Sequence, residues 1–390
     1  MRILFLSRAG GLQIGGIAEV VLHLSNYLSE LGAQVFVYNN GKLNTEQPLD
    51  LIHNGTPCYS GPIIKPGISG WFSKNKTMRP LIELVYKNKI DIIQTLSLYR
   101  AGHAAMMLKK ITGIPFVITS HGDILPTSSD RISRKAIIKR CKTILKSADA
   151  ITHLTDKMAN ISHQILDTTP KSHIIPNGID LAHWQSIKTD QPLDYIFLIG
   201  RLVKEKGFDV IIDALSILIR NGNPTSLVIA GEGPFEQDLV QCAKNHHLNV
   251  VYHSADDLNT LPTQSICFIG PIKGHVKRQA FCRSRAVLFP TQPHLCEEAF
   301  GLVPFEAIAA KRPLIISNLN RAYQLQQSGF DIDIVEQPDK PENWVTKIQD
   351  RLQFNIDQRI QIDNNFRLLN NFDWSYIAKQ YYDLYKKIIK

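Results

Sequence analysis

Hydrophobic residues along this chain follow two alternating patterns. Short apolar runs rich in Val, Ile and Leu, such as residues 3–6 and 195–199, are separated by longer segments such as 17–31, whose apolar residues recur at helical spacing. Runs without polar alternation indicate strands that are buried on both faces, which is typical of parallel sheets covered by helices. The pattern therefore predicts an α/β fold.

Each half of the chain carries its own series of strands. In the first half we expect strands near residues 3–6, 34–38, 90–94, 115–119, 150–153 and 173–175, and helices at 17–31, 103–112 and 131–147. The second series has strands at 195–199, 227–229, 266–269, 286–289, 314–316 and 332–335. Gly and Pro interrupt the pattern at 43–80, where we expect irregular structure with a mobile loop around 62–79.

The length of 390 residues favours two domains, because one hydrophobic core seldom supports so many. The run Ile175-Pro176-Asn177-Gly178-Ile179-Asp180 ends a strand in a turn and leads through a polar stretch to Pro192. We therefore place an N-terminal domain at 1–185, a C-terminal domain at 186–371 and a terminal segment at 372–390. Two such Rossmann-like domains, facing each other across a cleft, would bind ligands at the carboxyl ends of their strands.

The chain is basic, with 44 Lys and Arg against 35 Asp and Glu, and its formal net charge of +9 favours an anionic partner. Residues 131–146 hold seven basic and no acidic residues, with a stripe at helical spacing made of Arg131, Lys135, Lys139, Lys142 and Lys146. A solvated helix face explains such a stripe, and so does contact with an anionic membrane surface or an acidic acceptor. Nucleic acid is disfavoured, because no base-stacking module accompanies the charge.

The six cysteines are dispersed without a CxxC pair, which fits reduced, buried thiols better than a disulfide framework or a zinc site. We therefore expect no metal. The apolar run at residues 1–6 is too short for a secretory signal, and no window reaches the roughly 18 apolar residues of a membrane span. We expect a cytoplasmic protein, either free or peripheral at the cytoplasmic face of a membrane.

Glu298 and Glu306 bracket a turn that contains Gly301 and leads into a helix. Pro304 lacks an amide hydrogen and is tolerated in a first helical turn, which places the helix start near 301–303. The exposed amides there suit an anion, and Glu306 would lean back toward them to accept hydrogen bonds from a ribose diol. Glu298, before the turn, would meet a hexose hydroxyl. The alternative is a surface carboxylate pair favoured only by the helix dipole.

Strand ends in the first half carry further candidates. Gly15 and Gly16 follow the first strand and precede a helix, where they either permit close approach of the backbone to a phosphate or its sugar, or serve the turn alone. His121 follows the fourth strand and either donates to a hexose hydroxyl or a departing oxygen, or is structural. Asp123 is the nearby candidate for contacting an acceptor.

Arg201 and Lys206 follow the first strand of the second half and flank a helix start. Cations oppose the dipole at a helix N-terminus, so a diphosphate held between them explains them better than chance decoration. Such a clamp stabilises negative charge on a leaving group without a metal. Gly231 and Gly233, after the next strand, permit a tight turn near a nucleotide and are equally compatible with packing.

In their order and spacing these elements resemble the family-4 group (glycosyltransferase group 1 type) of retaining glycosyltransferases with the GT-B fold. The resemblance covers nearly the whole chain and rests on Gly15-Gly16, His121-Gly122, the run at 175–180, Gly200-Arg201 with Lys206-Gly207, Gly231-Glu232-Gly233-Pro234, and two glutamates separated by seven residues. Residues 372–390, which begin Phe372-Asp373-Trp374-Ser375, also resemble the family's terminal helix, which crosses back onto the first domain.

The resemblance implies a nucleotide-diphosphate sugar as donor, no cofactor and no metal. It also implies a glycan or lipid-linked acceptor, as in polysaccharide or lipopolysaccharide biosynthesis. Arg201 and Lys206 would hold the diphosphate, Glu306 the ribose, and Glu298 and His121 the donor sugar. Backbone contacts would come from Phe300, Gly301, Leu302 and Val303.

The implied attack is front-face, with the departing phosphate helping to deprotonate the acceptor, so no residue is assigned as a nucleophile. Ala299 stands where the family commonly has Pro, and Glu297 precedes Glu298, so Glu297 is the alternative ligand of the sugar. A sugar-nucleotide epimerase, a phosphorylase or a non-catalytic binding module of the same fold is the alternative function.

Overall fold

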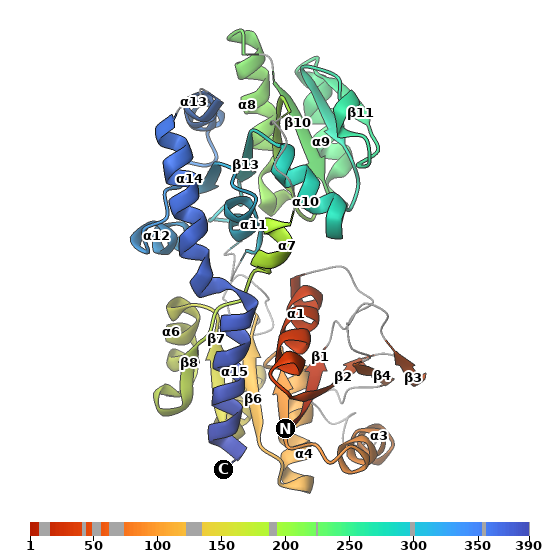
Figure 1. The fold of residues 1–390 in the computed structure, drawn as a ribbon. Coiled ribbons are helices and arrows are strands. Elements are labelled where there is room, and N and C mark those ends of the chain that lie inside the picture. The colour runs from red at the N-terminus through yellow and green to blue at the C-terminus, as the bar shows by residue number, and fades with distance from the viewer. Residues whose placement is uncertain are drawn as a thin grey trace. The chain divides into compact units, whose positions relative to one another are not determined.

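The computed structural model describes residues 1–7, 16–40, 44–48, 56–61, 74–121, 135–186, 193–223, 225–296, 301–352 and 356–389. The chain forms two compact units, Met1–Gly178 with Phe372–Lys390, and Ile179–Asn371 (Figure 1). The second unit begins at Ile179, which is earlier in the chain than the domain boundary expected after residue 185. The reason is that α7 (Leu181–Gln185) packs within it, where the ring of Trp184 meets that of Phe281 edge to face at 5.5 Å.

The first unit is built on an eight-stranded sheet in the order β3-β4-β2-β1-β5-β6-β7-β8. The strand pairs are parallel, apart from the antiparallel pair of β3 and β4. The strands are β1 Arg2–Ser7, β2 Gln34–Asn40, β3 Asn44–Pro48, β4 Pro57–Gly61, β5 Ile92–Thr95, β6 Phe116–Ser120, β7 Ala150–His153 and β8 Ser172–Ile174. The helices are α1 Gly16–Glu30, α3 Lys74–Lys87, α4 Arg100–Thr112, α5 Lys135–Ser147, α6 Asp156–Ile165 and α15 Trp374–Ile389.

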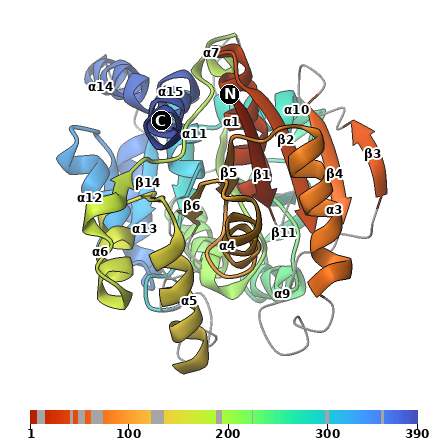
Figure 2. The ribbon, with the colours of Figure 1, turned by 90° about the horizontal axis from the view of Figure 1, so that it is seen from below.

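The first sheet is buried on both faces, as the uninterrupted apolar run of β1 predicts. Leu4 and Leu6 join a core with α3, α4 and α5, whereas Ile3 and Phe5 join a second core with α1 and α15. Figure 2 shows this sheet between α1 and α15 on one side and α4 and α5 on the other. Successive strand residues point to opposite faces, so one apolar strand serves both cores.

The terminal helix α15 is part of the first unit, to which buried polar contacts attach it. The Tyr385 hydroxyl donates to Gln94 Oε1 at 2.7 Å, and the Tyr381 hydroxyl lies 3.2 Å from Thr119 Oγ1. Trp374 packs on Gly178, where an added Cβ would lie 2.5 Å from the indole ring. Burial of these groups without their partners would be costly, so the network fixes the position of the helix.

The second unit contains a seven-stranded, wholly parallel sheet in the order β11-β12-β10-β9-β13-β14-β15. Its strands are β9 Tyr195–Ile199, β10 Ser226–Ala230, β11 Asn249–Tyr252, β12 Ser265–Phe268, β13 Ala286–Phe289, β14 Leu314–Ser317 and β15 Asp333–Val335. Its further helices are α8 Phe208–Arg220, α9 Glu236–Asn245, α10 Gly274–Arg283, α11 Val303–Ala309, α12 Asn320–Gln327, α13 Pro341–Leu352 and α14 Ile356–Leu368.

The central strand β9 is buried on both faces too. Ile196 and Leu198 join the core made with α8, α9 and α13. On the other face the Phe197 ring meets that of Phe281 at 5.1 Å. The predicted α/β class is confirmed, and every strand expected from the sequence is present.

The expectation of irregular structure at 43–80 is wrong for the part of it that the structure describes. β3, β4 and the start of α3 lie there, and Pro80 lies inside α3. Met78, Leu81 and Leu84 are buried in the core, and this burial outweighs the helix-breaking tendency of proline. Residues 62–73 of the expected loop lie outside the described residues. Within the described part of the chain, no helix is long and apolar enough to cross a membrane.

Candidate active site

The strand order of the second sheet indicates where a ligand would bind. The neighbours of β9 are β10 on one side and β13 on the other, so the order of the sheet reverses at β9. In open parallel sheets, ligands bind outside the carboxyl ends of the strands at such a reversal. The loops after β9 and β13 carry Arg201, Lys206 and the segment leading to Glu306, which are the residues that the sequence singles out.

The backbone on either side of Arg201 is held by the loop after β10. Gly231 has φ +136° and lies against Gly200, where an added Cβ would be 1.9 Å from the carbonyl oxygen. A Cβ at Gly233 would be 2.3 Å from the oxygen of Leu202, whose amide donates to Glu232 O at 2.9 Å. Close packing of the backbone thus requires glycine at positions 231 and 233, whether or not a nucleotide binds there. The Arg201 side chain is exposed, and among the described residues none forms a hydrogen bond or ion pair with its guanidinium.

Lys206 ends a 3-10 turn, Lys204–Lys206, directly before α8. Its ammonium lies 5.3 Å from the centroid of the Phe289 ring, at the carboxyl end of β13. Gly207 follows in the left-handed region with φ +66°, and a Cβ there would come within 2.3 Å of Pro290 O. These contacts join the loop after β9 to the loop after β13 and place Lys206 at the edge where the strand order reverses.

The loop after β13 contains buried polar atoms without hydrogen-bond partners. Thr291 Oγ1 and Gln292 Oε1 are both buried and have no hydrogen-bond partner. The amide nitrogen of Gln292, in contrast, donates to Pro290 O and Pro338 O at 3.0 and 3.1 Å. Buried polar atoms are nearly always paired, so these two oxygens are available for hydrogen bonds to a polar ligand.

Glu306 lies in the first turn of α11, as expected from Pro304, and is 7% exposed. One carboxylate oxygen accepts a hydrogen bond from the Lys277 ammonium, and the other, Oε2, is buried without a partner. Lys277 on α10 is itself only 16% exposed at its side chain. The pair leaves Oε2 as the oxygen that can accept from a bound hydroxyl.

Sequence reasoning missed Lys277, although a signal for it was present. The first turn of α10 carries no acidic residue, and the run from Lys273 to Arg278 is basic. Cations at a helix start oppose the dipole, and this argument singled out Arg201 and Lys206. Applied to the helix after β12, the same argument would have singled out Lys277.

In the first unit, His121 follows β6 at the carboxyl edge of the sheet, as predicted. Its Nε2 is buried without a hydrogen-bond partner, and burial lowers the pKa of the imidazole from 6.5 to about 4. A neutral imidazole can donate from one nitrogen and accept at the other, which suits a sugar hydroxyl better than a phosphate.

Several predicted site residues lie outside the described residues, namely Gly15, Asp123, Glu297, Glu298 and Phe300. Others are placed at their expected positions: Gly16 begins α1, and Gly301, Leu302 and Val303 lead into α11. The Leu302 carbonyl accepts from the Glu306 amide at 3.0 Å, which closes the first turn. The roles of all these residues stay predictions.

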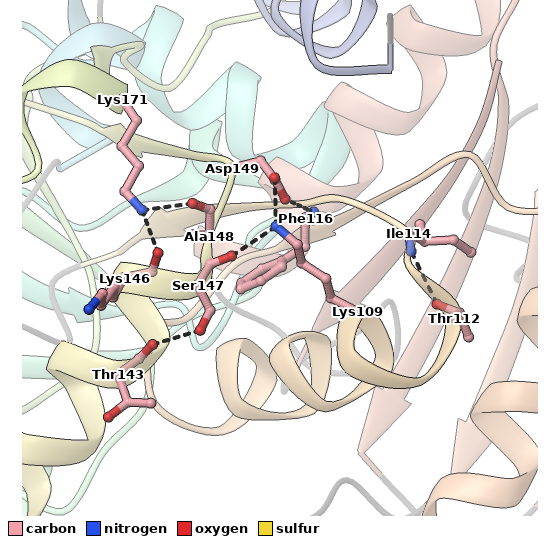
Figure 3. Close-up of polar contacts among 10 residues, drawn as sticks. All are labelled: Lys109, Thr112, Ile114, Phe116, Thr143, Lys146, Ser147, Ala148, Asp149 and Lys171. Atoms are coloured by element: carbon pink, nitrogen blue, oxygen red, sulfur yellow. Dashed lines mark hydrogen bonds and ion pairs between the residues drawn. The ribbon is translucent and has the colours of Figure 1, made fainter.

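A basic face runs along α5. Its exposed lysines are Lys135, Lys139, Lys142 and Lys146, while Cys141, Ile144 and Leu145 are buried. The predicted Arg131 lies outside the described residues. Two lysines from neighbouring elements hold the end of α5: Lys171 donates to Lys146 O and Ala148 O at 2.9 and 2.7 Å, and Lys109 donates to Ser147 O at 3.1 Å (Figure 3). Cations near the last carbonyls stabilise a helix C-terminus.

Replacing Lys277 with Met should destabilise the protein, because it leaves the buried Glu306 carboxylate without its cation. We expect a loss of about 3 kcal/mol in the free energy of unfolding. Lys273→Met, one turn earlier and exposed, is the matched control, with an expected change of at most about 0.5 kcal/mol. Urea denaturation measures both, and equal effects of the two variants would contradict a buried pair.

His121 should stay neutral far below neutral pH. Its pKa is lower in the folded than in the unfolded chain, so only the unfolded chain takes up the proton as pH falls below 6.5. The stability that the neutral ring contributes is therefore present above pH 6.5 and is lost as pH falls toward about 4. Histidine NMR titration, with His121→Gln to assign the signal, should give a midpoint of about 4. A midpoint at the ordinary value of 6.5 would refute the burial of the ring.

Two family descriptions match consecutive parts of the chain. Glycosyltransferase Family 4 matches residues 14–183, and Glycosyl transferases group 1 matches residues 182–367. Glycogen synthase of Mycobacterium tuberculosis is 28% identical over 224 residues, which are 56% of this chain and 50% of that protein. The match thus spans half the length of that relative. An uncharacterized glycosyltransferase of Methanocaldococcus jannaschii is 22% identical over 93% of this chain and 91% of its own length.

Solved structures share the fold. Anabaena HepE, crystallised with UDP, has a TM-score of 0.76 at 16% identity, over 99% of this chain and 100% of that one. A glycosyltransferase from Rickettsia africae has a TM-score of 0.75 at 17% identity, over 100% and 98% of the two chains. The consecutive family matches, together with this likeness of fold, show that the chain belongs to the family-4, group 1 glycosyltransferases and has their GT-B fold.

Proposed function

We propose that this glycosyltransferase is a retaining, metal-independent hexosyltransferase that uses a nucleotide-diphosphate sugar. The observation that carries the proposal is that Arg201 and Lys206 follow β9, where the strand order reverses, while Glu306 lies in the first turn of the helix that follows the neighbouring strand β13. The two cations suit a diphosphate, and the open carboxylate oxygen suits a ribose hydroxyl. The Anabaena HepE structures with UDP and UDP-glucose support a donor of this class.

In the proposed reaction, the bond between the sugar C1 and the phosphate oxygen breaks, and a bond from C1 to the acceptor oxygen forms on the same face. The acceptor proton passes to the departing phosphate, so no protein nucleophile is needed. Arg201 and Lys206 would stabilise the negative charge that develops on that phosphate. Glu298 and His121 would orient the hexose, with Glu297 as the alternative to Glu298.

The acceptor in this proposal is a glycan or a lipid-linked sugar. An acceptor carried by a lipid requires the enzyme to approach a membrane, and the basic face of α5 suits an anionic surface. Its four exposed lysines lie on one side of a helix whose opposite side is attached to the core. Each such lysine contributes about 1 kcal/mol near an anionic bilayer.

Donor binding tests the first part of the proposal. Titration calorimetry with UDP, GDP and ADP sugars should find binding of at least one donor. Arg201→Ala should weaken that binding by about 1.5–3 kcal/mol, which is roughly 10- to 150-fold, because charge-assisted hydrogen bonds to the diphosphate are lost. Glu306→Ala should also weaken it.

Arg220→Ala is the matched control, since Arg220 is exposed at the far end of α8 and should leave donor affinity unchanged. The proposal fails if no donor binds, or if the Arg201 and Arg220 variants bind alike. Proton NMR of the first-formed glycoside tests retention: the product should keep the anomeric configuration of the donor, and an inverted product would reject the front-face mechanism.

Membrane binding is tested by cosedimentation with vesicles that contain anionic lipid. Replacing Lys139 and Lys142 with Gln should weaken binding by about 2 kcal/mol, or roughly 30-fold, at low salt. The matched control replaces the exposed Lys244 and Lys340, which lie in the second unit. Binding should fall in high salt. Salt-insensitive binding, or equal loss in both double variants, would argue against the basic face.

A further inference from the structure

Outside the candidate active site, one cluster of side chains has the composition of a metal site. Asp213 on α8 and Cys242 and His246 at the end of α9 place one ligand atom each within 4.8 Å of one another. The Cys242 thiol donates to Asp213 Oδ1 at 3.4 Å, and His246 Nε2 lies 2.7 Å from the same oxygen. Carboxylate, thiolate and imidazole from two packed helices form a set that suits zinc.

The spacing along the helices explains why these groups meet. Cys242 and His246 are four residues apart, so they lie on one face of α9 where it meets α8. Asp213 lies on the facing side of α8, with Asp209 one turn before it. Asp209 Oδ1 is buried without a hydrogen-bond partner, and the Cys242 sulfur lies 4.0 Å from the carbonyl oxygen of Asp209.

Two of the three distances between ligand atoms can be compared with those around a tetrahedral ion. Zinc bonds of about 2.0–2.3 Å place neighbouring ligand atoms about 3.3–3.7 Å apart. The sulfur-to-oxygen distance of 3.4 Å already has this value, and the nitrogen-to-oxygen distance of 2.7 Å must lengthen. His246 is exposed and follows the last helical residue of α9, so its ring has room to move.

We propose that Asp213, Cys242 and His246 bind one zinc ion, with Asp209 or water as the fourth ligand. On binding, the thiol S–H bond breaks, the sulfur bonds to the metal and the proton leaves to solvent. In the metal-free protein that thiol donates to Asp213 Oδ1. The three groups then form a hydrogen-bonded cluster that occupies the same positions.

The ion would have a structural role, separate from the transfer reaction. It would join α8 to α9, and the loops that precede these two helices carry Lys206 and the pair Gly231 and Gly233. Zinc would therefore strengthen the packing beneath the backbone that holds Arg201. Because it binds the folded chain, it would also raise the thermal midpoint, and the rise would grow with the logarithm of the free zinc concentration above the dissociation constant.

Zinc titration of the tag-free chain of 390 residues after chelator dialysis tests the proposal, with a chromophoric competitor to report affinity. We expect one tight site per chain, a rise in thermal midpoint, and a sulfur-to-cobalt charge-transfer band when Co²⁺ replaces zinc. Cys242→Ser and His246→Ala should each weaken zinc binding at least about tenfold, and Cys242→Ser should abolish the band.

Two matched controls guard against adventitious binding by other thiols and imidazoles. Cys296→Ser and His247→Asn change a cysteine and a histidine outside the cluster and should leave zinc affinity unchanged. Failure of the wild-type chain to bind zinc tightly overturns the proposal, and so does equal weakening by control and cluster variants. If Cys242→Ser or His246→Ala fails to fold, the cobalt spectra of the wild-type chain and of Asp213→Asn test the proposal instead. The proposal is overturned if the wild-type spectrum lacks the charge-transfer band. It is also overturned if Asp213→Asn leaves that band unchanged.

Discussion

The close approach of two backbone loops at the carboxyl edge of the second sheet is the constraint on which the candidate active site depends. Gly231 and Gly233 pack against Gly200 and Leu202, with no room for a side chain at either position. The loop between them accepts from the Leu202 amide, so the segment around Arg201 is fixed from both sides. Because the backbone is already fixed, only the Arg201 side chain must be ordered when it binds an anion, which favours affinity.

Charge at this edge is arranged around that fixed backbone. Lys206 and Arg201 follow β9, while Lys277 occupies one oxygen of Glu306 and leaves the other open. Lys277 offsets the cost of burying the Glu306 carboxylate, and it also adds positive charge near the proposed diphosphate. The glutamate therefore depends on a partner from a different helix, and its two oxygens have different functions.

Much of the fold follows from local patterns, because buried strands and amphipathic helices leave periodic traces in the sequence. The strands around β1 and β9 are examples. The sequence patterns fail to predict elements whose stability comes from tertiary contacts. One example is α3, which stays helical around Pro80 because Met78 and Leu81 are buried in the core. The edge strand β11 was also missed.

The same limit applies to the sites. The sequence singles out Arg201 and Lys206 because a strand end and a helix start identify them locally. The contact of Lys277 with Glu306, and the cluster of Asp213, Cys242 and His246, depend on which helices pack together, and sequence spacing within one helix does not record such contacts. Glu298, the predicted sugar ligand, lies outside the described residues, so its role rests on its place in the sequence and on the resemblance.

A crystal structure of the chain with a bound UDP sugar, or with whichever donor binds best, tests the central claim most directly. We expect the diphosphate oxygens within hydrogen-bonding distance of Arg201 and Lys206, and a ribose hydroxyl donating to Glu306 Oε2 while Lys277 keeps the other oxygen. A nucleotide bound elsewhere, or a diphosphate that contacts neither Arg201 nor Lys206, would contradict the proposed site.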